Sequence, residues 1–255
     1  MSLSADLCLG TVDAIVDRLG LVEVPGDGTP ERMQLTSPMS PDAPVGAMRL
    51  WRAAGVADLV YVGLTVQMIG LDSHMLFAFT PPESPVPHFT LDSVAGGPPP
   101  GADPDATPSF AFHLDLIPKV DLGAHLPYLR HCFEPLTALR SAAQETPGLT
   151  PAHLSPTQYA VMSAWMLVHR ADESAFSSIR PHVDAYRDHW FSLVEGGVPE
   201  SALAGLAPAD FAERDRRNRS IVFDATVDPV WDRVTQLVGP EQSEAVRSTL
   251  AAPIV

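Results

Sequence analysis

Short runs of mainly apolar residues fill the stretch between residues 33 and 117 and predict β-strands. The runs are rich in Val, Phe, Leu and Thr, and clusters of Gly, Pro and Asp separate them. They are MQLTSP (33–38), AMRLWRAA (47–54), LVYVGLTVQMI (59–69), HMLFAFT (74–80), HFTLDSV (88–94) and SFAFHLDLI (109–117). Because the connections are too short for crossover helices, the pattern predicts an antiparallel meander.

Apolar residues at helical spacing precede and follow these strands. The first helix is predicted at Leu3–Leu19, with Ser4 as its N-cap and Gly20 as its end. Later helices are predicted at 122–133, 133–144, 175–194, 209–223, 229–238 and 241–250, with one more strand at 164–170. Since no internal repeat or interdomain linker interrupts the chain, we expect a single domain over residues 1–255, with helices on both faces of one antiparallel sheet.

Polar side chains recur at every second position of three predicted strands, and we expect them on one face of the sheet. This polar set consists of His74, Thr80, His88, Thr90, Asp92, His113 and Asp115. The alternate positions, Met75, Phe77, Phe79, Phe89, Leu91, Phe112, Leu114 and Leu116, form a strongly apolar face. The polar face is either a wet outer surface or the floor of a cleft. Periodicity alone favours the wet surface, which antiparallel sheets commonly have.

A cover over the polar face would bury His and Asp side chains together. The proline-rich segment VAGGPPPGADPDATPS (94–109), predicted to be a surface loop, and the C-terminal helices could provide that cover. Burial raises the pKa of a carboxyl group and lowers that of a histidine, so both approach neutrality and exchange protons efficiently. Metal binding by His74, His88 and Asp92 is disfavoured, because the chain has no HxH, HxxxH or HExxH spacing. A serine nucleophile would lack a GxSxG motif.

Charge and composition narrow the possible partners. The chain carries 31 acidic and 16 basic residues, a net charge of −15, which argues against nucleic acid and anionic membranes. Lys119 is the only lysine, so the chain has no P-loop motif. Cys8 and Cys132 are isolated and are expected to be buried as small hydrophobic side chains. An acidic N-terminal stretch and the lack of an apolar run of about 18 residues lead us to expect a cytoplasmic protein.

Four arginines lie close together in AERDRRNRSIVFD, at Arg214, Arg216, Arg217 and Arg219. On one interpretation they belong to a solvated helix face, where neighbouring acids balance their charge. On the other, they bind carboxylates of a substrate or attract an acidic partner protein. The sequence leaves both interpretations open.

Four segments carry a resemblance to a known family: LDSHMLFAFTPP, PHFTLDSVAGG, HLDLIPKVDLGAHLPYL and VDPVWDRVTQLVG. Together they resemble the ferredoxin-dependent bilin reductase superfamily, most closely its red chlorophyll catabolite reductase branch. That branch is indicated by DLIPKVDLGAHLPYL (115–129), where the Asp-Leu, Pro, Asp-Leu, His and Tyr-Leu spacing matches without gaps. The resemblance spans residues 71–250.

The resemblance implies a three-layer α/β/α sandwich that holds an open-chain tetrapyrrole between its sheet and its C-terminal helices. It implies that no metal or organic redox cofactor is bound, and that an external ferredoxin supplies electrons while side chains supply protons. Matched residue by residue, Asp92 and Asp228 fall on proton donors, and His74, with one inserted residue allowed, falls on their partner. Gly63 stands where some bilin reductases carry a glutamate. We expect the substrate to contact His88, His113 and the four arginines, which could also meet ferredoxin.

Two other functions compete with tetrapyrrole reduction. One is a cofactor-independent acid/base enzyme of bacterial secondary metabolism, such as a β-carboline-forming cyclase that condenses an amine with an aldehyde. Gly63 and the charge repulsion between this acidic chain and an acidic ferredoxin favour it. The other is a non-catalytic carrier of a tetrapyrrole or another small molecule. Structural roles also compete: Asp228 could cap a helix, and His74 could be a core histidine. Asp92 favours a functional role, because a carboxylate is poorly suited to mid-strand.

Overall fold

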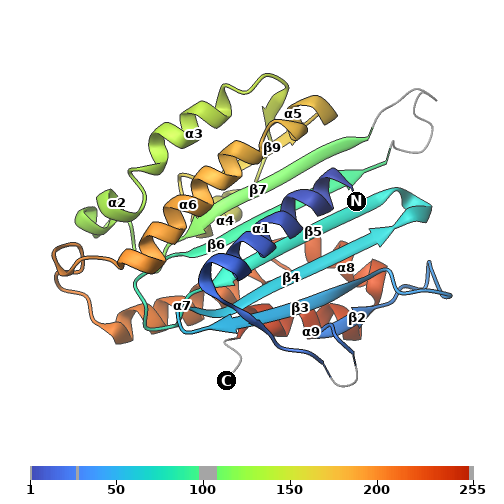
Figure 1. The fold of residues 1–255 in the computed structure, drawn as a ribbon, viewed down its shortest axis with the longest axis horizontal. Coiled ribbons are helices and arrows are strands. Elements are labelled where there is room, and N and C mark those ends of the chain that lie inside the picture. Colours follow the sequence, from blue (N-terminus) through green and yellow to red (C-terminus); the bar gives the residue numbers. More distant parts are fainter. Residues whose placement is uncertain (1, 27–28, 98–107, 253–255) are drawn as a thin grey trace.

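The computed structural model describes residues 2–26, 29–97 and 108–252, and its strands form one nine-stranded antiparallel sheet (Figure 1). The strand order is β1-β3-β4-β5-β6-β7-β9-β8, and β2 also pairs with β3. The strands are β1 (Val22–Glu23), β2 (Met33–Leu35), β3 (Gly46–Ala53), β4 (Val56–Val66), β5 (Leu71–Phe79), β6 (His88–Gly96), β7 (Ser109–Ile117), β8 (Leu149–Pro151) and β9 (Leu167–Ala171). The predicted meander is therefore confirmed, since β3 to β7 are neighbours in both sequence and space.

Helices cover both faces of this sheet. They are α1 (Leu3–Leu19), α2 (Leu126–Cys132), α3 (Leu136–Gln144), α4 (Pro156–Val161), α5 (Glu173–Ser177), α6 (Arg180–Gly196), α7 (Pro208–Val222), α8 (Val230–Val238) and α9 (Pro240–Ala251), with 3-10 turns η1 (Gln67–Ile69) and η2 (Glu200–Ala202). The α1 and α6 helices lie on one face, and α4 with α7 to α9 lie on the other (Figure 1). This is the expected three-layer α/β/α sandwich.

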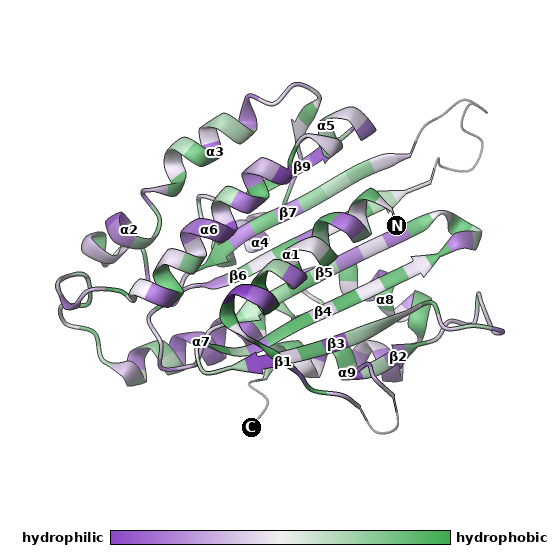
Figure 2. Cartoon of the chain, viewed as in Figure 1, coloured by the Kyte–Doolittle hydropathy of each residue, from purple (hydrophilic) through white to green (hydrophobic). Residues whose placement is uncertain are grey.

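Each helical layer packs on its own apolar core. The first core joins Cys8 of α1 and Trp190 of α6 to strand residues such as Leu91. The second joins Trp231 of α8 and Leu250 of α9 to β3, β4 and β5. Figure 2 shows the hydrophobic residues of the central strands between the two layers. Because the central strands are buried on both faces, apolar side chains point both ways from them.

Several predicted helix boundaries were wrong. Ser2 caps α1, with its Oγ accepting the Ala5 amide at 3.1 Å, whereas the expected cap, Ser4, is buried. The single helix expected at 175–194 is divided into α5 and α6, because Pro181 has no amide hydrogen and belongs to the first turn of a new helix. The α2 and α3 helices are shorter than expected, and most of the proline-rich segment, residues 98–107, lies outside the described residues.

The register between neighbouring strands decides which polar residues share a face. Asp92 of β6 lies opposite His113 of β7, and Thr90 lies opposite Asp115. However, Asp92 lies opposite Met75 of β5 on its other side, whereas His74 lies opposite Ser93. Residues directly opposite each other point to the same face, so the prediction that His74 shares a face with Asp92 was wrong. Alternation within a strand separates its side chains into two faces. It does not say which of these faces lies on the same side of the sheet as a given face of the neighbouring strand.

His74 instead belongs to a polar chain beneath α1. The Tyr61 hydroxyl lies 2.7 Å from His74 Nδ1, and Asp72 Oδ1 lies 2.9 Å from its Nε2. Asp72 also accepts hydrogen bonds from Thr65 and from Ser2. His74 is among the residues that border the cavity described below, but this network engages both nitrogens of its buried ring, so its side chain has the surroundings of a structural residue.

Replacing Gly63 by Ala is expected to lower the free energy of unfolding by about 1–3 kcal/mol, because the added methyl group overpacks this site. A Cβ at Gly63 would lie 2.5 Å from the Tyr61 hydroxyl and 3.1 Å from His74 Nδ1. Urea unfolding measures the effect. Gly196→Ala is the matched control, since nothing lies within 4 Å of a Cβ built there. Equal stability of the two variants would contradict the prediction.

Candidate active site

A cavity of about 700 Å³ lies between the sheet and the second helical layer. Its floor comes from β4 to β7, and its walls come from α4, α7, α8 and the segments around them. Most of the lining is apolar and includes Met75, Phe77, Phe223 and Trp231. The volume lies in the range of small-molecule sites. Of the two interpretations of the polar face, the cleft is therefore the one that the structure shows.

Asp92 and His113 lie side by side on the cavity floor. The register of β6 and β7 places them directly opposite each other, with Asp92 Oδ2 3.4 Å from His113 Nδ1. The second atom of each group, Asp92 Oδ1 and His113 Nε2, is buried without a hydrogen-bond partner among the described residues. Asp92 keeps 39% and His113 14% of its side-chain surface exposed, so a ligand can reach both groups from the cavity that they line.

Asp228 lines the same cavity from the opposite layer. Its Oδ1 accepts the Val230 amide at 3.0 Å at the start of α8. The helix-capping interpretation is therefore correct in part, because this hydrogen bond contributes to the start of the helix. It also fixes the position of the carboxyl group on the cavity wall, so the structural and functional interpretations are compatible.

The surroundings of Asp228 and His113 raise the pKa of each group. Burial raises the pKa of Asp228, and the negative charge of Asp92 adds to this effect. Burial opposes protonation of His113, but the hydrogen bond and charge of Asp92, with the charges of Asp115 and Asp228, outweigh it and raise its pKa. The site can therefore hold protons on an acid and on an imidazolium beside a ligand.

Asp115 also faces this layer but is already engaged. Its carboxylate accepts the Ser163 amide at 2.8 Å and the Ser163 hydroxyl at 2.5 Å. Burial raises its pKa. Since Asp115 is fully buried and does not line the cavity, it acts on the site through its charge.

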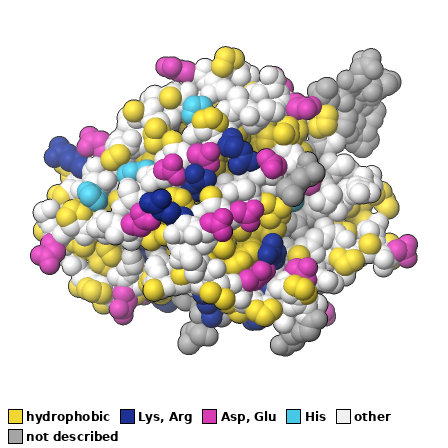
Figure 3. All heavy atoms as spheres, viewed as in Figure 1, with side chains coloured by type: hydrophobic (Ala, Val, Ile, Leu, Met, Phe, Trp, Pro, Cys, Tyr) yellow, Lys and Arg dark blue, Asp and Glu magenta, His cyan; other side chains and the backbone are white. Residues whose placement is uncertain are grey.

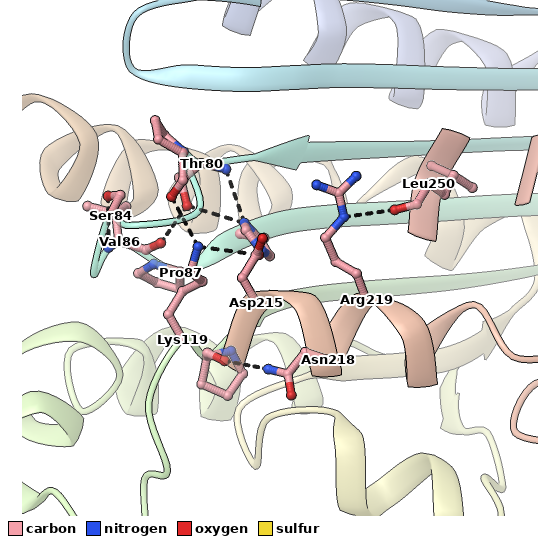
Figure 4. Close-up of polar contacts among 12 residues, drawn as sticks. Thr80, Ser84, Val86, Pro87, Lys119, Asp215, Asn218, Arg219 and Leu250 are labelled. Atoms are coloured by element: carbon pink, nitrogen blue, oxygen red, sulfur yellow. Dashed lines mark hydrogen bonds and ion pairs between the residues drawn. The ribbon is translucent and has the colours of Figure 1, made fainter. Parts of the chain in front are cut away.

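His88 shares the cavity face of β6 but lies in a separate buried network, not in the cavity lining. Its Nδ1 accepts the Thr80 amide at 3.0 Å, so Nε2 carries the proton and donates it to Asp215 of α7. Lys119 Nζ lies 3.3 Å from the same Asp215 oxygen and donates to the Pro81 carbonyl at 3.1 Å. Figure 4 shows Asp215 between the sheet and α7, with Lys119 beside it.

Arg219 completes this buried network. Its guanidinium lies 3.8 Å from the centroid of the Phe79 ring and donates to the Ala252 carbonyl at 2.9 Å. It also donates to the Leu250 carbonyl at 2.9 Å (Figure 4). Burial lowers the pKa of His88 to about 4 and that of Lys119 to about 8. His88 and Arg219, expected to contact the substrate, therefore hold α7 and α9 against the sheet.

Lowering the pH from about 6.5 to about 4 is expected to lower the free energy of unfolding by up to roughly 3 kcal/mol through His88. In this window the unfolded state binds a proton on His88 that the folded state does not bind, so stability falls as the pH falls. Urea unfolding over a pH series measures the slope. His88→Gln removes the titrating group and should flatten it, so an unchanged slope in that variant would contradict the assignment.

The remaining arginines of α7 differ in their surroundings. Arg216 and Arg217 are exposed and pair with Glu213 at 3.0 and 2.6 Å, as expected of a solvated helix face. Neither lines the cavity, so the structure places them away from the ligand that they were expected to bind. Arg214 lines a second, adjoining cavity. Of the four arginines, only Arg214 therefore lies near the candidate site.

Some residues of the site were not identified from the sequence. Arg233 and Gln236 of α8 line the cavity, and the charge of Arg233 acts on Asp228. Their proximity to Asp228 in VDPVWDRVTQ was a usable signal, since residues on the first turns of a helix lie near its start. The apolar residue Phe223 carried no such signal, because it resembles any core residue.

Metal-binding clusters and membrane-spanning helices also bear on function. No group of three or more His, Cys, Asp and Glu side chains within them is placed to hold a metal ion. Every helix in the described ranges is too short or too polar to cross a membrane.

The fold is shared with a solved enzyme. The crystal structure of selenomethionine-labelled phytochromobilin synthase from tomato, in complex with biliverdin, matches with a TM-score of 0.69 and 14% sequence identity. The match covers 95% of this chain and 80% of the tomato chain. No family model matches the sequence, and no curated protein sequence matches it. At this identity the similarity establishes the three-layer sandwich fold.

Proposed function

We propose that this protein reduces an open-chain tetrapyrrole held in the 700 Å³ cavity, with Asp92, His113 and Asp228 as its proton-transfer groups. The observation that carries the proposal is that these three ionisable groups meet at an otherwise largely apolar cavity. The fold is also that of a protein solved with biliverdin. A flat conjugated ligand suits a cavity with an apolar wall and a polar floor.

The proposed chemistry divides electrons and protons between two sources. Two molecules of reduced ferredoxin supply one electron each, and the site supplies two protons, so one carbon–carbon double bond of the ligand becomes a single bond. Asp92 is the central donor, and His113, whose Nδ1 faces it, returns a proton to it. Asp228 supplies the second proton from the opposite wall. Solvent then reprotonates His113 and Asp228.

The proposal is tested by adding biliverdin to the purified protein and recording the absorption spectrum. Binding in an apolar cavity is expected to shift the biliverdin bands, and addition of reduced ferredoxin is expected to produce a reduced bilin. Absence of both a spectral shift and turnover would contradict the proposal. The same assay with red chlorophyll catabolite as the ligand tests the closer resemblance to the red chlorophyll catabolite reductase branch.

A second candidate function keeps the proton-transfer groups but uses no electrons. On the cavity face, the β4 residue opposite Met75 is Val62, so β4 supplies no acid there. On the molecular face that carries α1 and α6, basic and acidic side chains lie interspersed (Figure 3), and its ion pairs include Arg18–Glu195 and Arg180–Asp6. Such a surface offers an acidic ferredoxin little attraction. Both observations favour a cofactor-independent acid/base enzyme, such as an amine–aldehyde cyclase.

A further inference from the structure

A second cavity of about 440 Å³ adjoins the first. The two cavities share four lining residues, Ala152, Met162, Val168 and His169. The walls of the second cavity come from α3, α4, β9 and α7, which lie far apart in the sequence. A molecule in the first cavity therefore lies next to the second.

Two arginines from different helices line the second cavity, Arg140 of α3 and Arg214 of α7. The Nε of each is buried and lacks a hydrogen-bond partner among the described residues. Arg140 Nη1 donates to Gln144 at 3.2 Å, and neither guanidinium forms an ion pair with a described acid. A buried N–H group of a cation without an acceptor is unfavourable, so an entering anion would gain strong, charge-assisted hydrogen bonds.

His169 of β9 borders both cavities, but it lies opposite Phe112, so its ring points to the face of the sheet that carries α1 and α6. Its side chain is almost completely buried and stacks on Phe112, with ring centroids 5.6 Å apart. Its Nδ1 also lacks a partner among the described residues. Among the described residues of the lining, the one acid is Asp121, which is exposed and accepts the Gly123 amide at 3.0 Å. The positive charge of the two arginines is therefore not balanced within the lining.

We propose that the second cavity binds a carboxylate or a similar oxyanion through Arg140 and Arg214. The planar guanidinium group matches the geometry of a carboxylate and can bind it through two hydrogen bonds. The anion is either a carboxylate arm of the ligand in the first cavity, an assignment that rests on the proposed function, or a free small anion.

The test compares biliverdin with its dimethyl ester, in which both carboxylates are masked. Absorbance titrations use the full chain and the variants Arg140→Gln and Arg214→Gln. Arg216→Gln is the matched control, because it removes the same charge from an exposed site on the same helix. If a carboxylate arm is bound, each test variant should weaken biliverdin binding roughly ten- to hundredfold while ester binding stays unchanged. Circular dichroism shows whether each variant is folded. If Arg214→Gln fails to fold, Arg214→Lys is used in its place.

Succinate and inorganic phosphate test the free anion. Either one should raise the melting temperature of the wild type and of Arg216→Gln, but not that of the two test variants. This result would support the cavity assignment even if biliverdin did not bind, so failure of the proposed function is distinguishable. Equal responses of all variants to biliverdin, its ester and the free anions would overturn the inference.

Discussion

Replacing Asp92 by Asn is expected to lower turnover by about 10²- to 10⁴-fold, the usual contribution of a positioned proton donor. Asn has the shape of Asp but cannot carry the proton to be transferred. Ligand binding should change far less, because most of the cavity lining is apolar. Turnover is measured from the absorbance of the bilin product, and binding from a titration without the electron donor.

The same variant has a second readout that needs no substrate. The hydrogen bond and charge of Asp92 raise the pKa of His113, so Asp92→Asn should lower that pKa, as measured by NMR of the imidazole. If Asp92 had only a structural role, a change in the pKa of His113 would not by itself be accompanied by a change in turnover. Asp232→Asn is the matched control, since it removes an exposed carboxylate from α8, outside the cavity lining. Normal turnover in Asp92→Asn would refute both enzyme assignments and favour a carrier.

Replacing Asp215 by Asn is expected to lower the free energy of unfolding by about 3–5 kcal/mol, the usual cost of breaking a buried ion pair. The change removes the counter-charge of Lys119, whose Nζ lies 3.3 Å from Asp215 Oδ1, and the nearby negative charge felt by Arg219. Both cations are buried. Urea unfolding, with circular dichroism as the probe, measures the loss.

Two comparisons make the Asp215 result specific. Glu213→Gln removes one acid from the same helix, but its arginine partners are exposed, so we expect little change in stability. Lys119→Met in the Asp215→Asn background should recover part of the loss, because it removes a cation that has lost its partner. If Asp215→Asn and Glu213→Gln were equally stable, the buried network would not hold α7 to the sheet.

The candidate site was partly visible in the sequence. Asp92 was identified because a carboxylate is poorly suited to the middle of a strand, which favours a functional role. Asp228 was identified because its segment resembles a known family. His113 was identified as a substrate contact, but its pairing with Asp92 required the register of β6 and β7. The error at His74 has the same origin. Its strand is buried on both faces, so the sequence could not decide which of the two faces lies on the same side of the sheet as Asp92.

The sequence by itself determined strands β2 to β7, the location of most helices and the antiparallel meander. These features depend on local periodicity, short connections and turn residues, all of which can be recognised in short stretches of the sequence. It missed β1, β8 and α4, which span two, three and six residues, because such short segments show no period. Only the tertiary structure decided that α7 to α9 cover the polar face, that His88 and Arg219 belong to a buried network, and that His74 lies beneath α1. The reason is physical: contacts between distant segments depend on strand register and helix packing, and local sequence patterns specify neither.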